Sequence, residues 1–261
     1  MVNFLPIVKT LETINISVRG LGQVVVDPAT IVVGNTSVVA RCRIDGVRGW
    51  RAIKCYTTSQ YCGDESIDSL YPQSLMVYTF RGREEYVDVS IGKWIDGDAL
   101  DVVLYRGGCD FVALSRAFDR MALAHLQRGA VHCDIKPENI IVRPDGEMEL
   151  IDASSVGSAA QGNRYGTPKF RHRYRSLRRT DKHTDHYPLS LISAMLAALV
   201  HDPYFLHETH AMDEYIADAM RILRDNDDAG HYNIIVAMQT SVMGKIEGIE
   251  ELFKSVVVAD E

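Results

Sequence analysis

The chain has 261 residues, of which 46% are hydrophobic and 24% are charged. This is ordinary globular composition, long enough for one large domain or for two modest lobes around a shared cleft. The formal net charge of −7 argues against a nucleic-acid binder that works by neutralising phosphates, and otherwise indicates only a soluble surface.

Short β-type runs dominate the first part of the chain. Residues 1–30 contain one or two strand candidates whose role the sequence leaves open. From Ile31 to Lys93 the chain is rich in Val, Ile and Tyr, and turn signals such as Asp45-Gly46 separate the runs. The alternation predicts about five antiparallel strands. Residues 58–73 interrupt them after the third and are long enough for a short helix, although their helical periodicity is poor.

From Asp98 onward the pattern becomes helical. Residues 110–129 place apolar side chains mostly three and four positions apart, and Gly129 can cap the end of that helix. Further helices are expected within residues 186–200, 212–226 and 233–258. A β-rich first half and a helical second half predict an α+β chain with two lobes. We divide it into an N-terminal extension (1–30), a first lobe (31–97) and a second lobe (98–261).

Cysteine usage and hydropathy indicate the compartment. The five cysteines are Cys42, Cys55, Cys62, Cys109 and Cys133. They form no Cys-x-x-Cys pair, so neither a disulfide framework nor a zinc site is predicted, and reduced thiols are expected. There is no basic leader with an apolar run at the N-terminus, and the apolar residues 187–200 are too few to cross a bilayer. We therefore expect a cytoplasmic protein without a membrane partner.

The residues His132-Cys133-Asp134-Ile135-Lys136-Pro137-Glu138-Asn139 precede an apolar strand, and a second strand ends at Asp152. Acidic and amide side chains at strand ends suit metal-assisted phosphoryl transfer. Asp134 can accept a hydroxyl proton, and Lys136 can neutralise charge on the transferred phosphoryl group. Asn139 and Asp152 offer the oxygen ligands that Mg²⁺ prefers. His132 is interpreted as a structural residue that braces the loop.

This stretch resembles the catalytic loop H-R-D-x-x-x-x-N of eukaryotic-type protein kinases, whose metal aspartate follows on the next hairpin. The lysine two positions after Asp134 is typical of the serine/threonine branch. The resemblance runs from about Ile31 to Val200. It implies a bilobal protein-kinase-like fold, with a β-rich N-lobe and a helical C-lobe, that uses ATP and Mg²⁺.

Other motifs occur in the order that the family has. Ala52-Ile53-Lys54 resembles the strand whose lysine holds the α- and β-phosphates. Counting back from it, the implied glycine-loop and adenine-packing positions are Val32, Gly34 and Val39. The implied hinge and ribose positions are Lys93, Ile95 and Asp98. The glycine loop is degenerate, and the better-looking run at residues 20–25 lies too far from Lys54 to serve.

The resemblance also implies supporting contacts. Glu65 is the best candidate to pair with Lys54, with Glu84 and Asp64 as alternatives. Thr167 belongs to a segment, residues 166–174, that resembles the substrate-facing part of serine/threonine kinases. Asp185 would hydrogen-bond the backbone of the catalytic loop.

Some positions depart from the family. Cys133 replaces the arginine that pairs with a phosphorylated activation loop, so activity would not depend on that switch. Cys133 could be a redox-sensitive thiol or simply a small buried residue. Ala153 and Ser154 stand where the family has Phe-Gly. The basic run at residues 169–179 could dock an acidic substrate or a phosphate, or it could be a solvated segment.

The sequence therefore predicts ATP-dependent phosphoryl transfer to Ser/Thr hydroxyls of a protein substrate, with Asp134 as the base and Asn139 and Asp152 holding Mg²⁺. One alternative is a pseudokinase or nucleotide-binding scaffold, favoured by the degenerate glycine loop. The other is a small-molecule kinase of the same superfamily. No nucleic-acid partner is expected, and the oligomeric state is left open.

Overall fold

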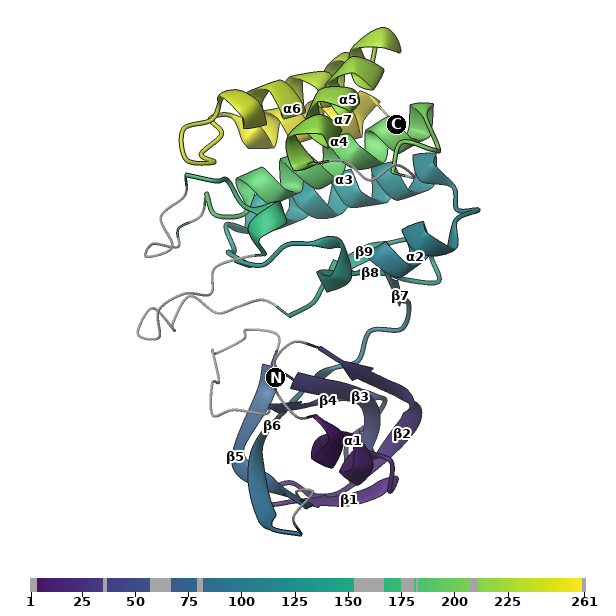
Figure 1. Cartoon of the computed structure of the whole chain (residues 1–261), viewed down its shortest axis with the longest axis vertical. Helices are drawn as coiled ribbons and strands as arrows, with labels where there is room; N and C mark the ends of the chain where they lie inside the picture. The colour runs from purple at the N-terminus through teal and green to yellow at the C-terminus, as the bar shows by residue number, and fades with distance from the viewer. Residues whose placement is uncertain are drawn as a thin grey trace. The chain divides into compact units, whose positions relative to one another are not determined.

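The structure is a computed structural model of the whole chain, and it describes residues 4–34, 37–56, 67–78, 82–152, 167–174, 181, 183–206 and 211–259. The chain divides into two compact units, Met1–Trp94 and Ile95–Glu261. Each unit is described by itself below (Figure 1).

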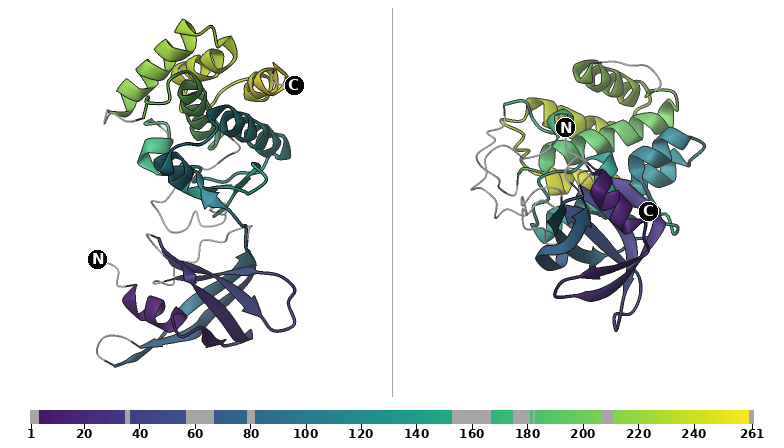
Figure 2. Two further views of the ribbon diagram at one scale, coloured as in Figure 1. Left: turned by 90° about the vertical axis from the view of Figure 1, so that its right-hand side faces the viewer. Right: turned by 60° about the horizontal axis from the view of Figure 1, so that its bottom comes forward.

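The first unit is a closed antiparallel β-barrel with one short helix (Figures 1 and 2). Its elements are α1 (Leu5–Leu11), β1 (Asn15–Val18), β2 (Gly22–Val33), β3 (Ser37–Ile44), β4 (Arg51–Tyr56), β5 (Ile67–Tyr78) and β6 (Glu84–Lys93). The strands run in the order β1-β2-β3-β4-β6-β5, and the pair Val18↔Leu75 joins β1 to β5 and closes the barrel.

This closure corrects the predicted fold. The chain is α+β, as predicted, but the bilobal protein-kinase-like fold is wrong, because the first sheet is a closed six-stranded barrel and not the open sheet of a kinase N-lobe. The closing strand β1 and the first part of β2 come from residues 1–30. Ile16, Val18, Val24 and Val26 alternate along these strands and are all buried, so the hydrophobic face continues until the sheet closes on itself.

The alternating side chains of the barrel form its core. One face of each strand contributes to a single buried cluster, and Ile7 and Leu11 of α1 belong to the same cluster. Residues 67–73, expected within an interruption that could hold a helix, are part of β5, and residues 58–66 lie outside the described residues. Along β3 and β4, the residues that alternate with this cluster lie on the outer face of the barrel.

The second unit combines a small sheet with a helical bundle. It contains β7 (Asp98–Ala99), α2 (Leu100–Arg106), α3 (Phe111–Arg128), η1 (Pro137–Asn139), β8 (Ile140–Val142), β9 (Met148–Leu150), η3 (Pro168–Phe170), α4 (His186–His201), α5 (Met212–Asp225), α6 (Ala229–Thr240) and α7 (Ile249–Ala259). The strands β7, β8 and β9 form an antiparallel sheet in that order.

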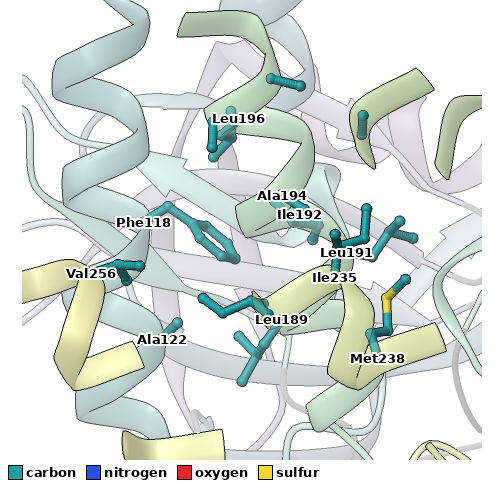
Figure 3. Packing of buried hydrophobic residues seen from close by; sticks show 14 of the residues in the cluster. Phe118, Ala122, Leu189, Leu191, Ile192, Ala194, Leu196, Ile235, Met238 and Val256 are labelled. Carbon is teal, nitrogen blue, oxygen red and sulfur yellow. The ribbon is translucent and has the colours of Figure 1, made fainter. Parts of the chain in front are cut away.

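Capping and packing explain the bundle. Asp110 accepts a hydrogen bond from the Ala113 amide at the start of α3, and Gly129, predicted to cap the helix, ends it in the left-handed conformation with φ 63°. The buried helix α4 packs against α3, α5 and α6. Figure 3 shows side chains of this core, among them Phe118, Leu189 and Ile235. Among the described residues, none of the helices has the length and apolar character needed to cross a membrane.

Candidate functional site

The loop between α3 and β8 is held in place by the buried carboxylate of Asp185, at the start of α4. One carboxylate oxygen of Asp185 accepts a hydrogen bond from the His132 amide at 2.5 Å, and the other accepts one from the Cys133 amide at 2.9 Å. His125 of α3 contacts the same carboxylate at 2.9 Å through its Nε2 atom. The contact with the loop backbone that was predicted for Asp185 is therefore present.

These contacts keep Asp185 ionised. Burial by itself would raise the pKa of the carboxyl, but the hydrogen bonds from His125 and from the His132 amide outweigh it and lower the pKa below its ordinary value. A buried carboxylate that accepts several hydrogen bonds is a rigid anchor, because losing any donor would leave charge unsatisfied in the interior. Asp185 thus fixes the backbone immediately before Asp134.

His132 braces the loop from the other side. Its ring is buried, and burial lowers its pKa, so the imidazole is neutral. The Asp134 amide donates to Nδ1 at 3.3 Å, which assigns the proton to Nε2, and Nε2 donates to the Ile151 carbonyl at 2.8 Å. His132 therefore ties the Asp134 loop to the residue just before Asp152. Its predicted role as a bracing residue agrees with this geometry.

Asp134, Lys136, Asn139 and Thr167 form one network of polar contacts. The Oδ1 atom of Asp134 accepts from the Thr167 amide at 2.8 Å and from the Thr167 hydroxyl at 3.0 Å. Lys136 Nζ lies 3.0 Å from Asp134 Oδ2 and 3.3 Å from the Thr167 hydroxyl. The structure thus brings together the three predicted catalytic residues, and Thr167 joins them from a segment more than thirty residues away.

Asn139 connects this network to the β8–β9 hairpin. Its side-chain Nδ2 atom donates to the Asp134 backbone carbonyl at 2.8 Å and to Asp134 Oδ2 at 3.2 Å. The backbone carbonyl of Asn139 accepts from the Ile151 amide at 2.9 Å. Because its side-chain nitrogen is engaged with Asp134, the side-chain oxygen of Asn139 is the atom that could bind a metal ion. Asp152 follows Ile151 directly, so the hairpin brings the two predicted ligands to neighbouring positions.

The donor set of Asn139 and Asp152 fits Mg²⁺, since one amide oxygen and one carboxylate are hard oxygen ligands. Within the described residues, no group of three His, Cys, Asp or Glu side chains could hold a metal ion by itself. Magnesium at phosphoryl-transfer sites commonly takes only one or two carboxylates, together with phosphate oxygens and water. Two ligands from the protein are therefore sufficient.

Strained backbone marks both ends of the site. Cys133 has φ 69° and Asp152 has φ 60°, in the left-handed region that residues other than glycine rarely adopt. Such conformations cost about 1–3 kcal/mol each and persist only where the surroundings impose them. Here the Cys133 amide is held by Asp185, and the residue before Asp152 is held by His132 and Asn139. Cys133 itself is buried, as one of its two interpretations expected.

Three of the predicted nucleotide-binding residues, Val32, Val39 and Lys54, lie side by side on the adjacent strands β2, β3 and β4, on the outer face of the barrel. The strand register pairs Val32 with Val39, and Val39 with Lys54. Ala52, two residues before Lys54 on β4, lies on the same face. Gly34 is in the β2–β3 connection, where its amide donates to the Ser37 carbonyl at 2.9 Å. The barrel therefore brings these candidates together on one surface.

The other candidates lie at or between the ends of β6 and β7. Lys93 is the last residue of β6, opposite Arg51, and Ile95 is the first residue of the second unit. Asp98 of β7 forms an ion pair with Arg106 at 2.5 Å. Gly97 lets β7 approach β8, since a Cβ there would lie 2.3 Å from the Val142 carbonyl oxygen.

Three acidic residues were predicted as possible partners of Lys54, and two of them cannot be placed. Glu65 and Asp64 lie outside the described residues. The other alternative, Glu84, is exposed at the start of β6, where it pairs with Tyr78. Lys54 Nζ lies 5.6 Å from the centre of the Tyr56 ring.

Sequence reasoning missed His125, the third donor to Asp185. A signal was available. Leu114, Phe118 and Met121 recur along α3 on the face that packs in the core, and His125 continues that spacing. A polar residue on an apolar helix face usually has a buried partner.

Comparison with known protein families and with curated proteins gave no match to this chain. The functional proposal therefore depends on the chemistry of these residues.

Proposed function

We propose that the chain is an ATP-dependent phosphotransferase that modifies Ser/Thr hydroxyls of protein substrates. The observation that carries the proposal is the network around Asp134. A carboxylate, an ammonium group and an amide converge within hydrogen-bond distance, on a loop whose backbone Asp185 and His132 hold rigidly. Pre-positioned groups of this kind are what in-line phosphoryl transfer requires, because the protein contributes mainly orientation and charge.

In the proposed reaction, Asp134 orients the acceptor hydroxyl and takes its proton. The acceptor oxygen bonds to the γ-phosphorus as the bond to the β-phosphate oxygen breaks, and ADP leaves. Lys136 offsets negative charge on the transferred group, which is the electrostatic help that a developing charge needs. The Thr167 hydroxyl occupies the position on Asp134 Oδ1 that a hydroxyl donor takes, so the acceptor would bind beside it or displace it.

Asn139 and Asp152 would hold Mg²⁺, which when bound would neutralise phosphate charge. Lys54 on the outer face of the barrel, with Val32, Val39 and Ala52 beside it, would supply the surface for the nucleotide. A cytoplasmic location, where ATP and reduced thiols coexist, belongs to the same proposal.

Substitution of Asp134 by Asn tests the proposal. Asp134→Asn removes the base while keeping the size of the side chain, and a positioned base contributes about 10²–10⁴ in rate. We expect transfer from γ-labelled ATP to a mixed protein substrate to fall by at least about 100-fold, while ATP binding measured by thermal shift persists. Asp145→Asn, on the exposed β8–β9 turn, is the matched control and should leave transfer unchanged.

The other two functions predict different results in this experiment. ATP binding without any transfer by the unsubstituted protein would identify a nucleotide-binding scaffold. Label on a metabolite and never on protein would identify a small-molecule kinase. Undiminished transfer by Asp134→Asn would refute the role assigned to the carboxylate.

A further inference from the structure

The segment Thr167–Tyr174 begins at the candidate site and carries an unusual charge. Thr167 is bound to Asp134 through both its amide and its hydroxyl. The next seven residues include Lys169, Arg171 and Arg173 and no acidic residue. By contrast, the unit Ile95–Glu261 as a whole has 26 Asp and Glu residues against 18 Lys and Arg residues. Positive charge is therefore concentrated next to Asp134 in a unit that is acidic elsewhere.

The segment is anchored on one side and exposed on the other. Phe170 packs against the hydrophobic core of the unit, and its amide donates to the Thr167 carbonyl at 2.9 Å. His172 makes an edge contact with the Tyr187 ring at 5.6 Å. Lys169, beside Phe170 in η3, and Arg173, beside His172, are exposed.

The charges of Lys169 and Arg173 are available to a partner. Neither side chain forms an ion pair with any residue in the part of the chain that the structure describes. Arg173 stacks on the exposed ring of Tyr174, with its guanidinium carbon 5.0 Å from the ring centre. Stacking of this kind holds a guanidinium in place and leaves its N–H groups free to donate to carboxylates.

We propose that the acceptor is an acidic protein segment that lies along Thr167–Tyr174, with Lys169 and Arg173 contacting carboxylates that flank the acceptor hydroxyl. The proposal rests on the proposed function, because Asp134 is taken as the group that receives the hydroxyl. Charge complementarity favours such a segment, because an acidic chain is repelled by most of the acidic unit and attracted at this place. A basic or neutral segment would gain nothing there.

Three serine peptides that differ only in their flanking residues test this inference. One has Asp and Glu beside the serine, one has Ala and one has Lys. We expect the unsubstituted protein to have the highest kcat/KM for the acidic peptide, about three- to tenfold above the alanine peptide, which two exposed ion pairs can supply. The preference should shrink when salt is added, because exposed charges are screened.

Two double variants test whether Lys169 and Arg173 are the source of the preference for the acidic peptide. Lys169→Ala combined with Arg173→Ala should bring the acidic-to-alanine ratio of kcat/KM close to one. Arg221→Ala combined with Lys254→Ala removes two exposed positive charges from α5 and α7 and should leave the ratio unchanged. Equal rates for the acidic and alanine peptides, or a ratio that survives the Lys169/Arg173 substitutions, would overturn the inference and leave the proposed function standing.

A binding measurement separates the two proposals. Fluorescence anisotropy with labelled peptides and the Asp134→Asn variant requires no turnover. Tighter binding of the acidic peptide that is lost with Lys169→Ala and Arg173→Ala supports the proposed contact along Thr167–Tyr174. This holds even if no peptide is phosphorylated, because the absence of phosphorylation contradicts only the proposed transfer reaction. Equal binding of all three peptides counts against the surface whatever the activity.

Discussion

Asp185 shows how much of the candidate site depends on one side chain. Its two oxygens accept from two consecutive backbone amides and contact His125, all within 3 Å. The left-handed backbone at Cys133 is stable because these bonds compensate for its cost. The residue that positions Asp134 thus lies about fifty residues away from it in the sequence.

Substituting Asp185 by Asn should destabilise the second unit by about 3 kcal/mol, because an amide N–H₂ would face backbone donors and His125 would lose its buried partner. Urea unfolding followed by circular dichroism at 222 nm measures this, since every long helix that the structure describes belongs to this unit. Asp101→Asn, an exposed position in α2, is the control and should change the free energy of unfolding by less than about 0.5 kcal/mol. Equal stability of the two variants would contradict the anchoring role.

At the scale of elements, a second buried polar network joins the helices of the bundle. His231 of α6 contacts Asp119 of α3 at 2.9 Å and Asp228 at 2.9 Å, and Ser193 of α4 donates to Asp119 at 2.6 Å. Burial would lower the pKa of His231, but its bonds to Asp119 and Asp228 prevail and raise the pKa to about 10. The imidazole is therefore charged in the folded protein at neutral pH.

This network should make the bundle lose stability as the pH rises. In the unfolded chain His231 has its ordinary pKa near 6.5, so the folded state binds the extra proton between that value and about 10. The contribution is complete below pH 6.5 and is lost as the pH approaches 10, with a slope of at most about 1.4 kcal/mol per pH unit. We expect His231→Gln to abolish this slope in urea unfolding followed at 222 nm.

The barrel provides an internal control for that experiment, because all nine histidines lie in the second unit and both tryptophans lie in the first. Tryptophan fluorescence should therefore report an unfolding transition that His231→Gln does not alter at any pH. A wild-type slope that persists in the variant would mean that another group carries the pH dependence.

The closing strand gives a second prediction at this scale. Deleting residues 1–20 removes α1 and β1 with the buried side chains Ile7, Leu11, Ile16 and Val18. At about 1.5–3 kcal/mol each, their burial contributes roughly 6–12 kcal/mol, which is comparable to the whole stability of a domain. We expect the cooperative unfolding transition seen by tryptophan fluorescence to disappear, while the helical transition at 222 nm remains.

The exposed ion pair of α1 supplies the control for the deletion. Lys9 and Glu12 lie 2.7 Å apart on the surface, and replacing both by Ala should change stability by less than about 1 kcal/mol. If the deleted protein kept a cooperative barrel transition, closure by β1 would not be what stabilises this unit.

At the scale of the whole molecule, Lys54→Ala tests whether the barrel takes part in the proposed reaction. Lys54 lies on the barrel, and Asp134 lies on the loop of the second unit. We expect Lys54→Ala to lower the rate of label transfer from ATP by about 100-fold, as loss of one electrostatic contact to a transferring phosphate does. Lys9→Ala is the control and should have no effect. If Lys54→Ala transferred label at the rate of the unsubstituted protein, Lys54 would have no role in the proposed reaction.

The double variant Lys54→Ala, Asp134→Asn adds information about coupling. Residues that act together in one reaction give losses far smaller than the product of the single losses. A combined loss equal to the product would indicate that the two residues act independently.

Several features could be predicted from the sequence because they depend on local chemistry. Apolar spacing and Gly129 fixed the extent of α3, and the interval between Asp134 and Asn139 defined a loop whose side chains interact across five residues. Alternation along β3 and β4 gave the strands that place Val39 and Lys54 in one row. Each of these follows from positions only a few residues apart.

Only the tertiary structure decided which segments meet. Nothing in the pattern of residues 1–30 says that β1 pairs with β5, because strand pairing depends on where the chain returns and not on local propensity. Likewise, His125 and Asp185 meet because α3 packs against α4. The sequence determined most of the elements and the spacing of the polar residues in the Asp134 loop, and long-range packing determined the closed barrel and the buried carboxylate that holds the loop.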